Sequence, residues 1–118
     1  MPIVINPSSL DKYYKSLVCQ IRYRCVESGV RFDIGVSDLE GIHAEYCPYF
    51  GYKLVYVGGM NTDSKANVDR IVPNLVYVPG NIRFISRLAN TMKSCATEEQ
   101  LILFAQAILR LHSVDSVC

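Results

Sequence analysis

The sequence predicts a small α+β domain in which a two-strand-and-helix unit is flanked by helices at both ends of the chain. Three observations predict it: helical spacing of apolar residues near the N-terminus, short β-rich runs in the middle, and a second helical pattern near the C-terminus. The length of 118 residues suits one domain covering residues 1–118. Half of the residues are apolar, which is enough for a modest core.

The first helix is expected over residues 9–28. Ser8 and Ser9 are good N-cap residues, and Gly29 suits the position just after a helix end. The apolar stripe of this helix should face the core, and its basic residues should face solvent. The stripe comprises Leu10, Tyr13, Tyr14, Leu17, Val18, Ile21 and Cys25, and the basic residues are Lys15, Arg22 and Arg24.

A β-like run at residues 30–36 comes next. Ser37 then begins a capping-box pattern, which predicts a short helix to about Glu45. Thr97 begins a second capping-box pattern and predicts a last helix to about His112.

The middle of the chain predicts a ββα unit at about residues 52–94. Residues 51–59 and 67–73 are predicted as strands, because both runs are rich in β-branched residues and the first also contains two tyrosines. Residues 76–79 are expected to be short and extended. A helix is then expected to open at Asn81, with an apolar stripe at helical spacing formed by Ile82, Ile85, Leu88, Ala89 and Met92.

Composition excludes several classes of protein. The net charge of +1 is low for a committed nucleic-acid binder. The five cysteines form no C-x-x-C pair, so free thiols are expected rather than disulfides or structural zinc. No apolar run approaches the roughly 20 residues of a membrane span, and the N-terminus lacks the pattern of a signal peptide. A cytoplasmic protein without membrane contact is therefore expected.

Four polar residues in the ββα unit are poor choices for plain structure. Asp69 and Arg70 are neighbours on a predicted strand, so their side chains point to opposite sides. If Asp69 faces Asn90 on the packed helix, a carboxylate oxygen and an amide oxygen come together. Such hard oxygen ligands suit Mg²⁺, which keeps several waters. Asn81 has a structural alternative as the cap of the predicted helix.

Four segments carry a family resemblance: C-P-Y-F-G at 47–51, V-D-R-I-V-P at 68–73, V-Y-V-P-G-N-I at 76–82 and S-R-L-A-N-T-M-K at 86–93. They resemble the HNH endonuclease superfamily, whose core is the ββα-metal fold. The resemblance is closest to a bacteriophage HNH-like group that has D-R-I in place of D-H-I. That group has C-P-x-x-G, S-x-D-R-I-D-P, G-Y-x-x-G-N-V and S-x-x-A-N-x-x-K, followed by a Thr-capped helix.

The resemblance implies a metal-dependent endonuclease or nickase that hydrolyses DNA phosphodiester bonds, acting in the host cytoplasm if phage-encoded. It implies Asp69 and Asn90 as ligands of Mg²⁺ or Mn²⁺. It also implies that the Asn81 side chain holds the turn between the two strands. The residues expected near the DNA backbone are Arg83, Arg87 and Lys93.

The chain departs from the motif at the residue that would activate water. The first His of the HNH motif is Arg70 here, and arginine is a poor base because it stays protonated, although it can bind a phosphate. His43 is then the better of the two histidines as the base. The second Asp of D-R-I-D is Val72. The alternative is therefore a catalytically degenerate scaffold that binds DNA or a host protein, as an inhibitor or counter-defence module. A plain α+β domain without metal is the third hypothesis, and the oligomeric state stays open.

Overall fold

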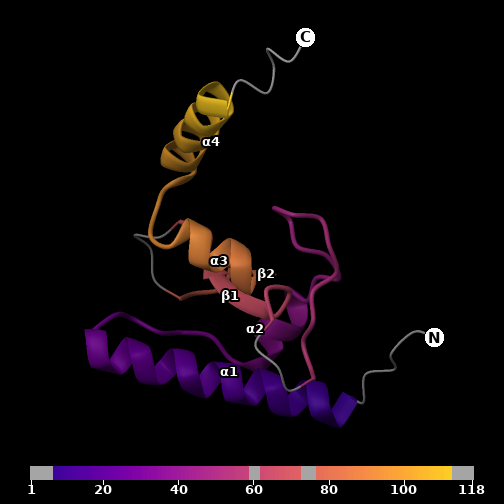
Figure 1. The fold of residues 1–118 in the computed structure, drawn as a ribbon. Helices are drawn as coiled ribbons and strands as arrows, with labels where there is room; N and C mark the ends of the chain where they lie inside the picture. Colours follow the sequence, from indigo (N-terminus) through magenta and orange to yellow (C-terminus); the bar gives the residue numbers. More distant parts are fainter. Residues whose placement is uncertain (1–6, 59–61, 73–76, 113–118) are drawn as a thin grey trace, which may run out of the picture.

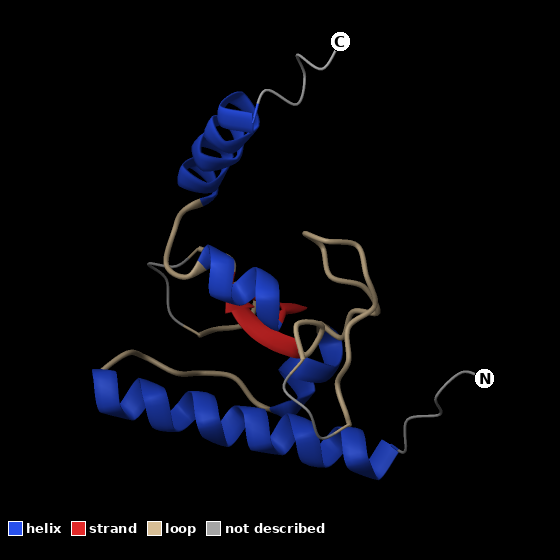
Figure 2. Cartoon of the chain, in the orientation of Figure 1, coloured by secondary structure: helices blue, strands red, loops and turns tan. Residues whose placement is uncertain are grey.

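The computed structural model describes residues 7–58, 62–72 and 77–112, and within them the fold is mixed α+β, with four helices and one two-stranded antiparallel sheet. Figures 1 and 2 show the sheet between the long first helix and the short third helix, while the last helix stands away from both. The helices are α1 (Pro7–Ser28), α2 (Val36–Gly41), α3 (Arg87–Lys93) and α4 (Glu98–His112), and the strands are β1 (Ala66–Arg70) and β2 (Ile82–Ser86).

Helix α1 confirms the predicted first helix. Gly29 follows it with a φ of +71°, a left-handed conformation that glycine adopts without strain. The N–H of Val30 then donates to the carbonyl of Cys25 at 2.9 Å, which satisfies a carbonyl of the last turn. The apolar stripe packs toward the core, where Tyr14, Ile21 and Cys25 are buried.

The caps of α2 and α4 explain where these helices begin. Helix α2 starts at Val36, and its N-cap is Gly35, two residues before the predicted cap Ser37, because the Asp38 carboxylate accepts the N–H of Gly35 at 2.8 Å. It ends at Gly41 and does not reach the predicted end at Glu45. The capping box before α4 is confirmed, since Thr97 and Gln100 exchange reciprocal side-chain-to-backbone hydrogen bonds of 2.9 and 3.2 Å.

The register of the sheet gives its two faces different chemistry. Val68 pairs with Phe84 on one face, and Asp69 pairs with Arg83 on the other. Phe84 stacks on Tyr14 of α1, with the ring centroids 5.9 Å apart. The Val68 face is therefore the apolar face toward α1, and the Asp69 face is the charged face toward α3.

The predicted helix from Asn81 is wrong over its first five residues, because Ile82–Ser86 form strand β2. Neighbouring Phe84 and Ile85 point to opposite faces of the sheet and are both buried. A strand that is buried on both faces lacks the alternating polar pattern that separates a strand from a helix. The helix begins only at Arg87, where Ser86 caps it by accepting the N–H of Ala89 at 3.1 Å.

The ββα unit is consequently built from β1, β2 and α3, and not from the strand predicted at 51–59. That segment forms only isolated bridges among the described residues, Lys53 with Tyr46 and Val55 with Lys65. The strand predicted at 67–73 is confirmed in part as β1. The β-like run at 30–36 contributes a single bridge between Phe32 and Tyr77. Residues 73–76 lie outside the described part, so the extended segment predicted at 76–79 is described only from Tyr77 onward.

Ser86 connects the cap of α3 to the core. Its hydroxyl is fully buried and contacts three groups: the Ala89 N–H at 3.1 Å, the Tyr52 hydroxyl at 3.0 Å and the Cys47 thiol at 3.4 Å. Because Cys47 and Tyr52 flank a tight turn, this one hydroxyl ties that turn to the start of α3. The turn itself is closed by the N–H of Gly51, which donates to the carbonyl of Cys47 at 2.8 Å.

Ser86→Ala should lower the free energy of unfolding by about 1–3 kcal/mol, because it removes a helix cap and the buried partner of two other polar groups. Urea denaturation followed by circular dichroism measures this change. The matched control is Ser16→Ala on the exposed side of α1, which should change stability by less than about 0.5 kcal/mol. Equal small effects in both variants would contradict the role given to Ser86.

Candidate functional site

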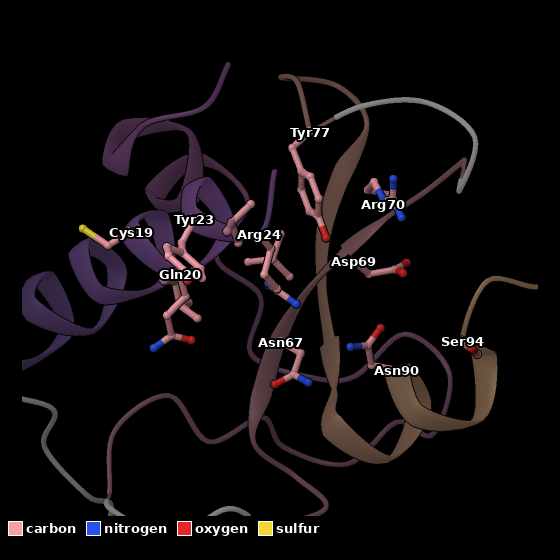
Figure 3. A pocket seen from close by; sticks show the side chains of 13 residues that line it. Cys19, Gln20, Tyr23, Arg24, Asn67, Asp69, Arg70, Tyr77, Asn90 and Ser94 are labelled. Carbon is pink, nitrogen blue, oxygen red and sulfur yellow. The ribbon is translucent and has the colours of Figure 1, made fainter. Parts of the chain in front are cut away.

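A cavity of about 650 Å³ lies between α1, β1, Tyr77 and α3. Figure 3 shows side chains from all of these elements around it. Its lining comprises Leu17, Cys19, Gln20, Ile21, Tyr23 and Arg24 from α1; Asn67, Val68, Asp69 and Arg70 from β1; Tyr77; and Asn90 and Ser94 from the end of the ββα unit. The cavity thus gathers Asp69, Arg70 and Asn90, three of the residues singled out in the sequence.

The Asp69 carboxylate forms a buried ion pair with Lys93 of α3. The Lys93 ammonium donates to Oδ1 at 2.9 Å and to Oδ2 at 2.8 Å. Asp69 is 5% exposed and Lys93 is 3% exposed. The same ammonium donates to the carbonyl of Arg70 at 2.8 Å. Lys93 therefore joins the last turn of α3 to the end of β1, with all three of its N–H donors used.

A second cation, Arg83, faces the same carboxylate from β2. Its Nε donates to Oδ2 of Asp69 at 3.1 Å, and its Nη2 contacts Oε1 of Glu98 at 3.1 Å. The guanidinium also lies 5.0 Å from the ring centroid of Tyr49, whose hydroxyl contacts both Arg83 and Glu98. We call these five residues, Asp69, Lys93, Arg83, Glu98 and Tyr49, the charge network.

The pKa shifts within the charge network follow from these contacts. Burial lowers the pKa of Arg83, but hydrogen bonds to the carboxylates of Asp69 and Glu98 raise it overall. The hydrogen bond from Tyr49, together with that from Arg83, holds the pKa of the Glu98 carboxyl below its usual value. Burial and the bond to Glu98 raise the pKa of Tyr49 to about 12. Arg83 and Glu98 therefore stay charged, and Tyr49 stays neutral, over the physiological pH range.

The Asp69 carboxylate does not fit the role of a metal ligand in this arrangement. Both of its oxygens already accept hydrogen bonds from cationic groups, two at Oδ2 and one at Oδ1. A divalent cation at the carboxylate would lie beside Lys93 and Arg83, and like charges at this separation repel strongly in a buried site. The described residues also hold no cluster of three or more His, Cys, Asp or Glu side chains with which a metal could be bound.

Asn81 lies where the chain enters β2, and its side chain reaches back to the end of β1. Its Oδ1 accepts the N–H of Val72 at 2.9 Å, and its Nδ2 donates to the carbonyl of Val72 at 3.2 Å. The Asn81 carbonyl accepts the N–H of Ile71 at 2.8 Å. These contacts join the two ends of the connection between the strands. The interpretation of Asn81 as a helix cap is wrong, because a strand follows it.

Arg70 and Asn90 line the cavity from different sides. The Arg70 guanidinium lies 5.0 Å from the ring centroid of Tyr77. Asn90 is half-buried on α3, and Figure 3 shows its amide on the same side of β1 as the amide of Asn67. Arg70 and Asp69 point to opposite sides of β1, as predicted, with Asp69 turned toward α3.

His43 is not brought to this cavity. It follows α2, contacts the hydroxyl of Tyr14 through Nδ1 and stacks on Tyr56 with the ring centroids 4.3 Å apart. It is not among the residues that line the cavity. The structure therefore separates the histidine proposed as the base from Asp69 and Asn90.

The three cations expected near the DNA backbone are separated from one another. Lys93 is buried against Asp69, Arg83 lies on β2 in the charge network, and Arg87 at the start of α3 is exposed. Arg87 lies 3.9 Å from the carboxylate of Asp63. The expectation that Arg83 belongs to the same helix as Arg87 and Lys93 is wrong, because residues 82–86 form strand β2.

The contribution of α1 to the cavity was missed by the sequence prediction. Gln20, Tyr23 and Arg24 line it, and Arg24 is exposed to solvent as predicted. Their spacing of i, i+3 and i+4 places them on one face of a helix, and this shared face can be read from the sequence. The sequence does not show that this face lies beside β1, so their place in the cavity could not be predicted.

Comparison of the chain with protein-family models, with curated proteins and with solved structures found no match. The helices in the described ranges include none with the length and apolar character needed to cross a membrane.

Lys93→Met should destabilise the fold by about 3–5 kcal/mol, because it leaves the buried Asp69 carboxylate with one cation fewer. Urea denaturation measures the loss. The double variant Asp69→Leu with Lys93→Met removes both buried charges and should regain a large part of it. A single-variant loss below about 1 kcal/mol, or a double variant less stable than Lys93→Met, would contradict the buried ion pair.

Proposed function

We propose that this chain is a nucleic-acid-binding module on an HNH-like ββα scaffold, and that DNA binds in the cavity between α1 and β1. The observation that carries the proposal is the composition of the cavity lining. Arg24 and Arg70 supply positive charge, Tyr23 and Tyr77 supply aromatic rings, and the amide side chains are those of Gln20, Asn67 and Asn90. These are the groups that bind backbone phosphates and bases.

The charge network supports this proposal by removing the negative charge of the cavity. Asp69 is the one carboxylate among the described lining residues, and Lys93 and Arg83 neutralise it from inside the protein. The remaining charged lining residues are Arg24 and Arg70. The lining therefore offers guanidinium groups to a phosphate although the whole chain carries a net charge of only +1.

The aromatic and amide groups add contacts that depend less on charge. The Tyr23 side chain on α1 is 68% exposed, which leaves much of its ring accessible for stacking on a base. Carboxamide side chains donate and accept hydrogen bonds with base edges. Stacking and amide contacts together favour a strand with accessible bases over a fully paired duplex.

Arg24→Ala should weaken DNA binding about tenfold, equivalent to about 1.4 kcal/mol, because one phosphate contact is lost. Fluorescence anisotropy with a labelled oligonucleotide measures the dissociation constant at several salt concentrations. With a single-stranded oligonucleotide, the slope of log affinity against log salt should fall by about 0.7.

The matched control for that prediction is Arg22→Ala. Arg22 lies on the same helix, is also exposed and is not among the residues that line the cavity. Arg22→Ala should change the dissociation constant by less than about twofold, because salt screens a charge that lies away from the bound phosphate. Equal losses in both variants would mean general attraction to a basic helix, and no binding by the wild-type chain would refute the proposal.

A metal-dependent endonuclease is the second candidate function. It is favoured by the position of Asp69 and Asn90, which come from a strand and a helix and line the same cavity. It requires Lys93 to leave the carboxylate, since the ammonium now contacts both Asp69 oxygens. It also requires a base other than His43, which lies in the aromatic cluster with Tyr14 and Tyr56.

The wild-type chain should neither nick nor cut supercoiled plasmid in Mg²⁺ or Mn²⁺, because Asp69 is held by two cations. Agarose gels over a time course measure this. Nicking that is lost in both Asp69→Asn and Asn90→Ala would replace the binding proposal with the endonuclease. Nicking that survives both substitutions would indicate a contaminating nuclease.

A further inference from the structure

Helix α4 is apolar around most of its circumference and yet has no buried residue in the described chain. Figure 1 shows it standing away from the sheet and from α1. Several of its large side chains are more than half exposed, including Phe104 at 65% and Leu111 at 82%. A helix with this pattern is usually covered by other protein.

The apolar residues of α4 form a seam with coiled-coil spacing. Leu101, Phe104, Ile108 and Leu111 follow one another at intervals of three, four and three residues. The polar residues Glu99, Gln106 and Arg110 occupy the opposite side of the helix. The seam can therefore pack against a second helix of the same kind while the polar stripe stays in water.

We propose that α4 pairs with α4 of a second copy of this chain, in antiparallel orientation. The first turn of α4 carries Glu98 and Glu99, and the last turn carries Arg110 and His112. Antiparallel pairing places the acidic end of each helix beside the basic end of the other, and it also aligns the two helix dipoles favourably. Parallel pairing would place two acidic ends together and two basic ends together.

The flanking positions select the antiparallel arrangement more specifically. Glu98 and His112 both lie beside the Leu101–Leu111 seam, on the same edge of it. In an antiparallel pair this edge meets the same edge of the partner, so Glu98 of each copy lies near His112 of the other. Glu98 is also fixed by Tyr49 and Arg83, which anchors the first turn of α4 to the charge network.

The first experiment measures the molar mass of the full chain by size-exclusion chromatography with light scattering, over a range of protein concentrations. The mass should rise toward that of two chains, since a helix of about four turns gives a concentration-dependent pair. Phe104→Glu with Ile108→Glu should weaken the pair at least tenfold, because both substitutions place charge in the seam. Gln106→Glu in the polar stripe is the matched control and should leave the mass unchanged.

Two outcomes would overturn the proposal. A wild-type chain that is monomeric at all concentrations would mean that α4 is not a self-association helix. A dimer that survives the double substitution would assign the contact to another surface.

The orientation is tested by cross-linking in a background where Cys19, Cys95 and Cys118 are replaced by Ser. Leu101→Cys and Leu111→Cys chains should form a disulfide when mixed and should not cross-link when each is alone. Self-cross-linking of each chain alone would overturn the antiparallel arrangement. Because Phe104, Ile108 and Leu111 lie outside the cavity, failure of this pairing would leave the DNA-binding proposal untouched.

Discussion

The buried contact between Asp69 and Lys93 is the interaction on which the rest of the structure depends. A carboxylate that is 5% exposed on a strand needs a partner, and the ammonium at the end of α3 supplies it. The same ammonium binds the Arg70 carbonyl, so one side chain fixes the distance between α3 and the end of β1. The ββα unit is therefore held by charge on one face of its sheet and by the Tyr14–Phe84 packing on the other.

This interaction also determines the chemistry of the cavity. A free carboxylate there would attract a metal ion and repel phosphate, whereas a neutralised one does neither. Arg83 completes the neutralisation and carries the charge network outward to Glu98, the first residue of α4. The side chains that shape the cavity are thus connected to those that position the projecting helix. The charge network therefore supports both the cavity proposed to bind DNA and the helix proposed to pair. The residues that would contact DNA differ from those that would contact the partner helix.

The sequence predicted the ends of the chain better than its centre. Helices α1 and α4 were predictable because capping residues and apolar spacing act locally, as Gly29 and Thr97 illustrate. Strand β2 was not, since Phe84 and Ile85 are buried on opposite faces and give no alternation. The capping role of Ser86 was missed as well, because it depends on β2 ending at this residue.

The candidate site was predictable only in part for a similar reason. The orientations of Asp69 and Arg70 could be predicted from strand geometry, but the partner of Asp69 could not, because Lys93 was expected near the DNA backbone. A lysine becomes buried when a carboxylate lies within its reach, and that distance depends on how α3 packs on β1. The role of Gln20, Tyr23 and Arg24 likewise depends on α1 lying beside β1.

The most direct test of this account is a calorimetric titration of the wild-type chain with Mg²⁺, beside Asp69→Asn. Neither protein should show saturable binding, because Lys93 and Arg83 already occupy the carboxylate of the wild-type chain. Saturable binding of one Mg²⁺ by the wild-type chain that is lost in Asp69→Asn would show that the ion pair opens for a metal. That result would contradict the account and make Asp69 a ligand.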